Sequence, residues 1–236
     1  MATVHGSWLR QGFFVLGNDA LMQLVRDELD RGLGLSHGTL RIRNFPVAAN
    51  WKHTYWWREG DIEYAEAQFF AQIAQDYAVL SLGLSVEKGY ENPRATAEPG
   101  KLMDRRTWDW PRLMNHVDAL FVTDVVATAE FLQGPVNVRM RSKQVPEGAW
   151  RTRTFSFSEG SWFERHVGRV EPEVVSDHVR ELDRQQDSWA IIHFAHDLGP
   201  IDVDGLSPAQ IANTLLGFDS LRRRLRGALS PGMSTV

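Results

Sequence analysis

Residues 136–158 read VNVRMRSKQVPEGAWRTRTFSFS, and both ends of this stretch alternate apolar with polar side chains. The alternation covers 136–143 and 150–158, with Pro146 and Gly148 between the two runs. A period of two is typical of strands with one buried face, and a short turn containing proline and glycine predicts a β-hairpin. Because a hairpin joins antiparallel neighbours, this stretch favours a mainly antiparallel sheet.

Patterns of helix and strand alternate irregularly along the rest of the chain. Neither GxGxxG nor GxxxxGK[ST] occurs, which disfavours a doubly wound nucleotide-binding sheet and predicts no nucleotide cofactor. The predicted fold class is therefore α+β, a mainly antiparallel sheet with hairpins packed by about four to five helices. Further strands are predicted over 39–45, 51–58, 77–88 and 189–196, and helices over 18–31, 61–75, 112–132, 173–184 and 207–225.

One α+β domain over residues 1–230 is the expected organisation, with a flexible tail over 231–236. The alternative is a subdivision at 89–100, a loop-like segment containing Gly89, Pro93 and Pro99. A hydrophobic content of 43% and a charged content of 24% are ordinary for a globular chain and exclude extensive disorder.

Charge and residue usage narrow the chemistry. The net charge of −4 provides no overall basic field, so any anion site must be a local patch. There is no cysteine, which excludes disulfides, thiolate catalysis and cysteine-ligated metals. No apolar run approaches the ~20 residues of a membrane helix, and the first residues do not resemble a signal peptide. A cytoplasmic protein with no cofactor and no membrane partner is expected.

An Arg-x-Arg pattern recurs in three predicted strands, where residues i and i+2 share a face. If the hairpin turns about Val145–Pro146, Arg141 faces Arg151 and Arg139 faces Arg153. Like charges directly opposite each other destabilise a ladder unless an anion is the partner. The alternative is that these arginines simply cover an ordinary solvent-exposed face of the sheet. The pattern comprises Arg41 and Arg43, then Arg139 and Arg141 continued by Lys143, then Arg151 and Arg153.

An aromatic stripe occupies the strand predicted over 51–58. Its rings at alternate positions, Trp51, His53, Tyr55 and Trp57, share one face. Such a row can stack on nucleic-acid bases, or it can be the core side of the strand. Both interpretations stay open at this point.

A second cluster, His193, His196 and Asp197, ends the strand predicted over 189–196, and His178 and Glu181 lie on the preceding helix. Histidine and carboxylates are the metal ligands or catalytic groups left to a chain without cysteine. On a strand, however, His193 and His196 point to opposite faces, which favours a structural role.

The favoured function is therefore that of a non-enzymatic binding protein, whose arginine-rich, aromatic-flanked sheet face binds a phosphate-bearing ligand, with nucleic acid preferred. The alternatives are a histidine- and aspartate-dependent hydrolase, with or without a metal at His193, His196 and Asp197, and an assembly subunit with a protein partner or a second copy of the chain. The residues expected to bind nucleic acid are Arg41, Arg43, Arg139, Arg141, Lys143, Arg151, Arg153, Trp51, Tyr55 and Trp57.

Overall fold

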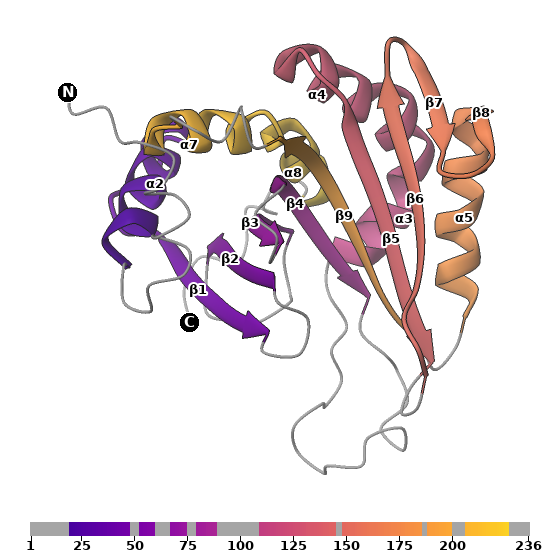
Figure 1. Cartoon of the computed structure of the whole chain (residues 1–236), viewed down its shortest axis with the longest axis horizontal. Helices are drawn as coiled ribbons and strands as arrows, with labels where there is room; N and C mark the ends of the chain where they lie inside the picture. Colours follow the sequence, from indigo (N-terminus) through magenta and orange to yellow (C-terminus); the bar gives the residue numbers. More distant parts are fainter. Residues whose placement is uncertain are drawn as a thin grey trace, which may run out of the picture. The chain divides into compact units, whose positions relative to one another are not determined.

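The computed structural model describes residues 19–47, 52–59, 67–74, 79–88, 109–144, 148–185, 188–199 and 206–226 (Figure 1). Its strands are β1 (Leu40–Val47), β2 (Lys52–Glu59), β3 (Gln68–Ala74), β4 (Leu80–Lys88), β5 (Val136–Gln144), β6 (Arg151–Ser158), β7 (Ser161–Glu164), β8 (Gly168–Val170) and β9 (Ser188–Leu198). Its helical elements are α2 (Asp19–Gly32), α3 (Asp109–Ala119), η2 (Leu120–Asp124), α4 (Val125–Leu132), α5 (Pro172–Arg184), α7 (Pro208–Leu216) and α8 (Asp219–Arg226).

Within these described residues the strands form one nine-stranded sheet in the order β1-β2-β3-β4-β9-β5-β6-β7-β8. The pairs β1–β2, β2–β3, β5–β6, β6–β7 and β7–β8 are antiparallel. The elements α3, η2 and α4 follow one another without a break in helical backbone, so the described part has five helices. The predicted α+β class with a mainly antiparallel sheet is confirmed. None of the described helices is long and apolar enough to span a bilayer.

Two compact units alternate along the chain. Unit 1 takes residues 1–61, 68–84 and 194–218, and unit 2 takes residues 62–67, 85–193 and 219–236. Unit 1 thus contains α2, β1, β2, β3 and α7 with parts of β4 and β9, and unit 2 contains the other helices and strands. The segment 89–100 and the tail 231–236 lie outside the described residues, so the expected single domain stays a prediction.

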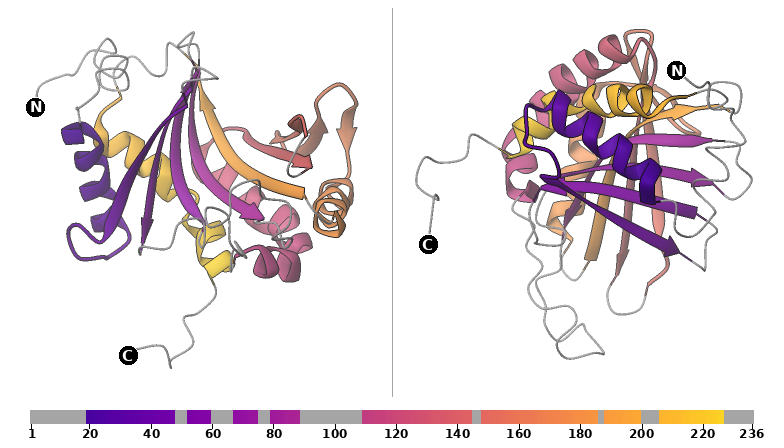
Figure 2. Two further views of the ribbon diagram at one scale, coloured as in Figure 1. Left: turned by 90° about the horizontal axis from the view of Figure 1, so that it is seen from below. Right: turned by 90° about the vertical axis from the view of Figure 1, so that its left-hand side faces the viewer.

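In unit 1, α2 lies beside α7, as both views of Figure 2 show for the indigo helix and the yellow helix next to it. Met22, Val25 and Leu29 recur at helical spacing on α2 and are fully buried. The end of α2 is tied to β1 by the buried carboxylate of Asp30, which accepts hydrogen bonds from the backbone N–H groups of Gly38 at 2.7 Å and Leu40 at 3.0 Å.

In unit 2, the helix formed by α3, η2 and α4 buries one side of every turn. Leu113, Val117, Phe121 and Val125 lie in the core at the spacing of helical turns. Trp162 of β7 donates its indole N–H to the carbonyl of Phe121 at 3.3 Å. These contacts hold the β5–β6–β7 strands against the long helix.

Two predicted helices differ from the structure. Residues 68–74 form β3 rather than part of a helix over 61–75. Phe69, Phe70 and Ala71 are successive and all buried, and a strand buried on both faces shows no alternation that would distinguish it from a helix. The last predicted helix, 207–225, is broken at Gly217–Phe218 into α7 and α8.

Candidate functional site

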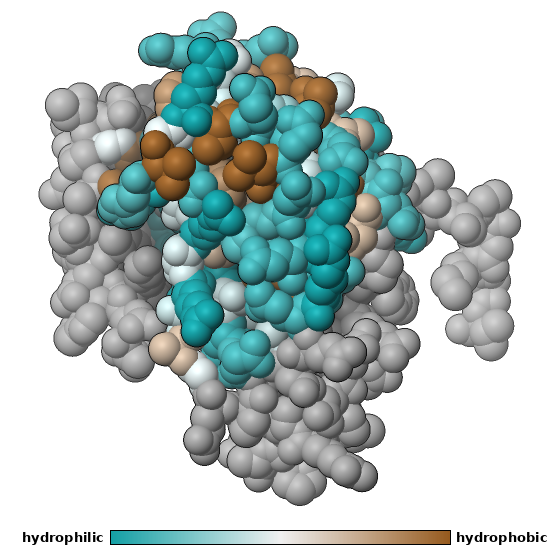
Figure 3. All heavy atoms as spheres, turned by 90° about the vertical axis from the view of Figure 1, so that its right-hand side faces the viewer, coloured by the Kyte–Doolittle hydropathy of each residue, from teal (hydrophilic) through white to brown (hydrophobic). Residues whose placement is uncertain are grey.

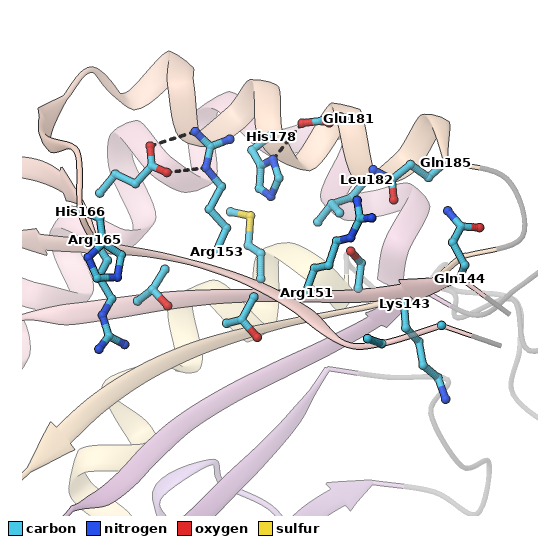
Figure 4. Close-up of a pocket in the computed structure, with 17 residues that line it drawn as sticks. Lys143, Gln144, Arg151, Arg153, Arg165, His166, His178, Glu181, Leu182 and Gln185 are labelled. Carbon is cyan, nitrogen blue, oxygen red and sulfur yellow. Dashed lines mark hydrogen bonds and ion pairs between the residues drawn. The ribbon is translucent and has the colours of Figure 1, made fainter.

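A pocket of about 730 Å³ lies within unit 2. The β5–β6 hairpin forms one wall, α5 forms another, and the turn between β7 and β8 lies at one end (Figure 4). Its permanent charges are four cations and two carboxylates, and two histidines also line it. The excess of cations makes the pocket attractive to anions. The charged and titratable lining residues are Lys143, Arg151, Arg153, Arg165, Glu164, Glu181, His166 and His178.

Arg153 of β6 is held by Glu164 of β7. Its Nε and Nη2 atoms donate to the two carboxylate oxygens at 2.6 and 2.8 Å, a bidentate pair that fixes the guanidinium plane (Figure 4). The guanidinium carbon also lies 5.1 Å from the ring centroid of Phe155. The hydrogen bonds from Arg153 hold the pKa of the Glu164 carboxyl below its usual value, and the same pair raises the pKa of Arg153.

This pair gives unit 2 an acid-sensitive contact. Because the pKa of Glu164 is lower in the folded chain than in the unfolded chain, its stabilisation is fully present above the ordinary pKa of 4.5 and is lost as the pH falls through the folded value. We expect the unfolding midpoint of Glu164→Gln to fall less steeply with pH below about 4.5 than that of the wild-type protein. Urea unfolding between pH 3 and pH 7 measures this, with Glu130→Gln on the exposed face of α4 as the control. Parallel pH curves for wild type and Glu164→Gln would contradict the expectation.

His178 of α5 is the second fixed side chain of the pocket. Its Nδ1 atom lies 3.0 Å from Oε2 of Glu181, one turn further along the same helix, and its side chain is 14% exposed. The imidazole packs beside the ring of Phe155, with centroids 6.1 Å apart. Burial is the largest effect on the pKa of His178 and lowers it; the hydrogen bond to Glu181 raises it and the nearby charge of Arg153 lowers it, so the net direction is downward.

The other three cations of the pocket have no carboxylate partner among the described residues. Arg151 begins β6 and is exposed, and Arg165 is exposed in the turn after β7, where its backbone N–H bonds the carbonyl of Thr154 at 3.0 Å. Lys143 of β5 contacts aromatic rings instead of carboxylates. Of these three, Arg151 shares the α5-facing side of the hairpin with Arg153, whereas Lys143 lies on the face of Arg141 and extends from the edge of the pocket, as Arg165 does, away from α5 (Figure 4).

Two tryptophans contact Lys143, whose side chain lies on the same face of β5 as Arg141. The Lys143 Nζ atom is 5.3 Å from the ring centroid of Trp150 and 5.2 Å from that of Trp189, and the two rings are 5.7 Å apart. The guanidinium of Arg141 lies 4.7 Å from the centroid of Trp150, and burial lowers the pKa of Arg141. Two cations and two partly exposed indole rings therefore lie together here: Arg141, Lys143, Trp150 and Trp189.

The hairpin register differs by one residue from the predicted one. Arg141 pairs with Thr152 and Arg139 with Thr154, rather than with Arg151 and Arg153. Directly paired residues share a face, so Arg139 and Arg141 lie on one face of the hairpin and Arg151 and Arg153 on the other. The predicted four-arginine face does not form, and only the second pair lines the pocket.

The apolar side chains explain this register. It pairs Val136 with Phe157 and Val138 with Phe155, so that all four lie on one face, and all four are buried. The predicted register would have placed the two phenylalanines on the face of Arg139 and Arg141, opposite the valines. A slip of one residue moves every side chain to the other face, so burial selects the observed pairing.

The aromatic stripe of β2 belongs to the core of unit 1. Tyr55 is 3% exposed and Trp57 is fully buried, with its indole N–H directed at the carbonyl of Met22 at 3.3 Å. Rings at this depth cannot stack on a ligand, so the assignment of Tyr55 and Trp57 to nucleic-acid binding is wrong and the core interpretation holds. Trp51 and the side chain of His53 lie outside the described residues.

The remaining predicted site residues do not gather into one site. Arg41 is exposed on β1 and pairs across the ladder with Arg58, and the side chain of Arg43 lies outside the described residues. His193 is 5% exposed in β9, and Asp197 accepts a hydrogen bond from the hydroxyl of Ser81 at 2.6 Å. The described residues contain no group of three histidine, aspartate or glutamate side chains that could hold a metal ion. His193, His196 and Asp197 therefore do not form such a group.

Several members of the pocket were not among the predicted site residues. Glu164, Arg165 and His166 lie on and after the short strand β7. Trp150 and Trp189, which contact Lys143 but do not line the pocket, were also missed and are far apart in the sequence. One feature of the sequence could have identified part of this pocket: His178 and Glu181 are spaced i, i+3 on a predicted helix, which places their side chains one turn apart on the same face. Their meeting with Arg153 depends on the packing of α5 against β6.

Comparisons of the chain with protein-family models, with curated proteins and with solved structures gave no significant match.

Proposed function

We propose that unit 2 binds a phosphate-bearing ligand in the pocket between the β5–β6 hairpin and α5, and that this ligand is nucleic acid. Arg151 contacts a phosphate inside the pocket, Arg153 presents the rest of its guanidinium from a fixed position, and Lys143 and Arg165 contact phosphates of the same strand beyond the edges of the pocket. The observation that carries the proposal is the excess of cations around one cavity, three of which have no acidic partner in the described part of the chain. A cytoplasmic location is part of the same proposal.

Nucleic acid is favoured over a small anion because rings adjoin the cations. Lys143 lines the pocket and also contacts Trp150 and Trp189. Phosphates next to partly exposed indoles suit a strand whose bases stack while its backbone is neutralised. Figure 3 shows this side of the molecule as hydrophilic over most of its area, with hydrophobic residues gathered in its upper part.

Fluorescence anisotropy with a labelled single-stranded oligonucleotide, titrated over a range of salt concentrations, tests the proposal. We expect affinity to fall with salt, because binding releases counterions from the phosphates. The double variant Lys143→Ala/Arg151→Ala is expected to bind at least about tenfold more weakly, with the salt slope reduced by about one for each cation that contacts a phosphate. The matched control is Arg223→Ala, which removes one exposed arginine of unit 2 that does not line the pocket.

Three results would overturn this assignment. Absence of salt-sensitive binding to RNA and to DNA would exclude nucleic acid as the ligand. Equal loss of affinity in Arg223→Ala and in the double variant would show that binding depends on general charge and not on the pocket. Binding of pyrophosphate without binding of any oligonucleotide would restrict the ligand to a small phosphate compound.

A further inference from the structure

The pocket also contains the groups of an acid–base reaction. The Nδ1 atom of His178 faces the carboxylate of Glu181 at 3.0 Å. A carboxylate accepts and does not donate, so this contact places the proton of a neutral imidazole on Nδ1 and leaves a lone pair on Nε2. A histidine oriented by a carboxylate in this way is the usual form of a general base. Figure 4 shows the ring directed from α5 toward the strands that form the opposite wall.

The charges around His178 favour its neutral, basic form. It faces Arg153 on β6, Glu164 on β7 and Glu181 on its own helix, and Phe155 of β6 packs against the ring. Burial and the charge of Arg153 lower its pKa, against the opposing effect of the two carboxylates. A neutral imidazole near pH 7 is ready to take a proton from a bound hydroxyl.

The same cavity supplies a second imidazole and fixed positive charge. His166 lines the pocket from the exposed turn between β7 and β8, at one end of the pocket, and the Arg153–Glu164 ion pair lies between it and His178 (Figure 4). Arg151 and Arg153 line the β6 wall, where they can stabilise negative charge that develops on a phosphate. A base, an acid and cations are what the cleavage of a phosphodiester by its own neighbouring hydroxyl requires.

We propose that unit 2 cleaves single-stranded RNA by transesterification, with His178 as the general base and His166 as the general acid. This proposal rests on the proposed binding of nucleic acid in the pocket. His178 Nε2 takes the proton of a ribose 2′-hydroxyl, and the 2′-oxygen forms a bond to the adjacent phosphorus. The bond from phosphorus to the 5′-oxygen breaks, and that oxygen takes a proton from the His166 imidazolium. The products are a 2′,3′-cyclic phosphate and a 5′-hydroxyl end, and proton exchange with water restores both histidines.

Glu181 is a positioning residue in this scheme, because it acts through His178. Removal of the Glu181 carboxylate frees the His178 imidazole to rotate and to change tautomer. The same change removes the negative charge that stabilises the imidazolium during proton transfer. Glu181→Gln is therefore expected to slow cleavage and to move the acidic limb of the pH–rate profile to lower pH, since the carboxylate raises the pKa of His178. A purely structural role of Glu181 would leave the position of that limb unchanged.

The test uses the full chain and a labelled single-stranded RNA oligonucleotide. We expect cleavage with 2′,3′-cyclic phosphate ends, identified by mass spectrometry, and no cleavage of the same oligonucleotide made with 2′-deoxyribose. His178→Ala and His178→Gln are expected to lower the cleavage rate by at least about 100-fold, with oligonucleotide affinity within about twofold of wild type. The control is His116→Ala, an exposed histidine of α3 that does not line the pocket.

The outcomes separate this proposal from the binding function. RNA that is bound with the expected salt dependence but not cleaved overturns the catalytic proposal and leaves the binding function standing. Cleavage that is equal in wild type and in both His178 variants, or equal with ribose and deoxyribose, also overturns it. Absence of binding overturns both proposals together. Unfolding curves of the variants show whether a lost activity comes from lost folding, and His178→Gln serves where His178→Ala does not fold.

Discussion

Replacement of Trp57 by alanine is expected to lower the free energy of unfolding by about 3–5 kcal/mol, the range typical of deleting a large buried aromatic side chain. Trp57 is fully buried in unit 1, and its indole N–H is directed at the carbonyl of Met22 at 3.3 Å. The truncation removes apolar contacts on all sides of the ring and leaves a cavity between β2 and α2. It also leaves the Met22 carbonyl without this donor.

Trp57→Phe is the matched variant, because it keeps most of the buried ring and removes only the N–H and part of the volume. Its expected cost is smaller, with about 1 kcal/mol from the lost hydrogen bond. Urea unfolding followed by circular dichroism measures both values. The same variants test the role of the stripe, because under conditions where Trp57→Phe is folded its oligonucleotide affinity is expected to equal that of wild type. A loss of affinity without a loss of stability would contradict the core position of Trp57.

Gly83→Val is expected to be at least as damaging, with a cost above about 3 kcal/mol. A Cβ atom at Gly83 would lie 1.8 Å from the carbonyl oxygen of Phe194 and 2.9 Å from the Cα of Ala195. Those are backbone atoms of β9, which no side-chain rotation can remove. The substitution therefore requires β4 and β9 to separate where both belong to unit 1.

The control for Gly83→Val is Ser85→Ala, a change at a buried position of the same strand that adds no atom. We expect Ser85→Ala to unfold close to the wild-type midpoint and Gly83→Val to unfold at a much lower denaturant concentration or to accumulate in insoluble form. Gly83→Ala, which adds only the colliding Cβ, is expected to be destabilised in the same direction. A wild-type midpoint for Gly83→Val would show that the backbone of β9 can give way at no cost.

Much of the local structure could be predicted because neighbouring residues determine it. Alternation over 136–143 and 150–158 corresponds to β5 and β6, and the capping residues Ser207 and Pro208 mark the start of α7, where Ser207 accepts from the Gln210 N–H at 3.2 Å. The prediction failed at β3, where burial on both faces removes the period on which strand recognition depends.

For the candidate site, the sequence predicted which kind of residue would take part but not how those residues are arranged. Arginines of the hairpin were expected to carry function, and Arg151 and Arg153 do line the pocket. The sequence pattern does not specify which face each pair occupies, because a loop of eight residues between Ser142 and Arg151 permits more than one register. Burial of Val136, Val138, Phe155 and Phe157 on a common face selects one of them.

By itself the sequence determined the α+β class, the hairpin and the local concentration of cations on a chain of net charge −4. Only the tertiary structure decided that Trp57 is core, that Glu164 holds Arg153, and that His178 with Glu181 faces the same cavity as Arg151. The physical reason is the distance along the chain between the residues that interact. Periodicity and capping act over a few residues, whereas a pocket depends on which buried faces pack together, and that packing is set by hydrophobic contacts between segments distant in the chain.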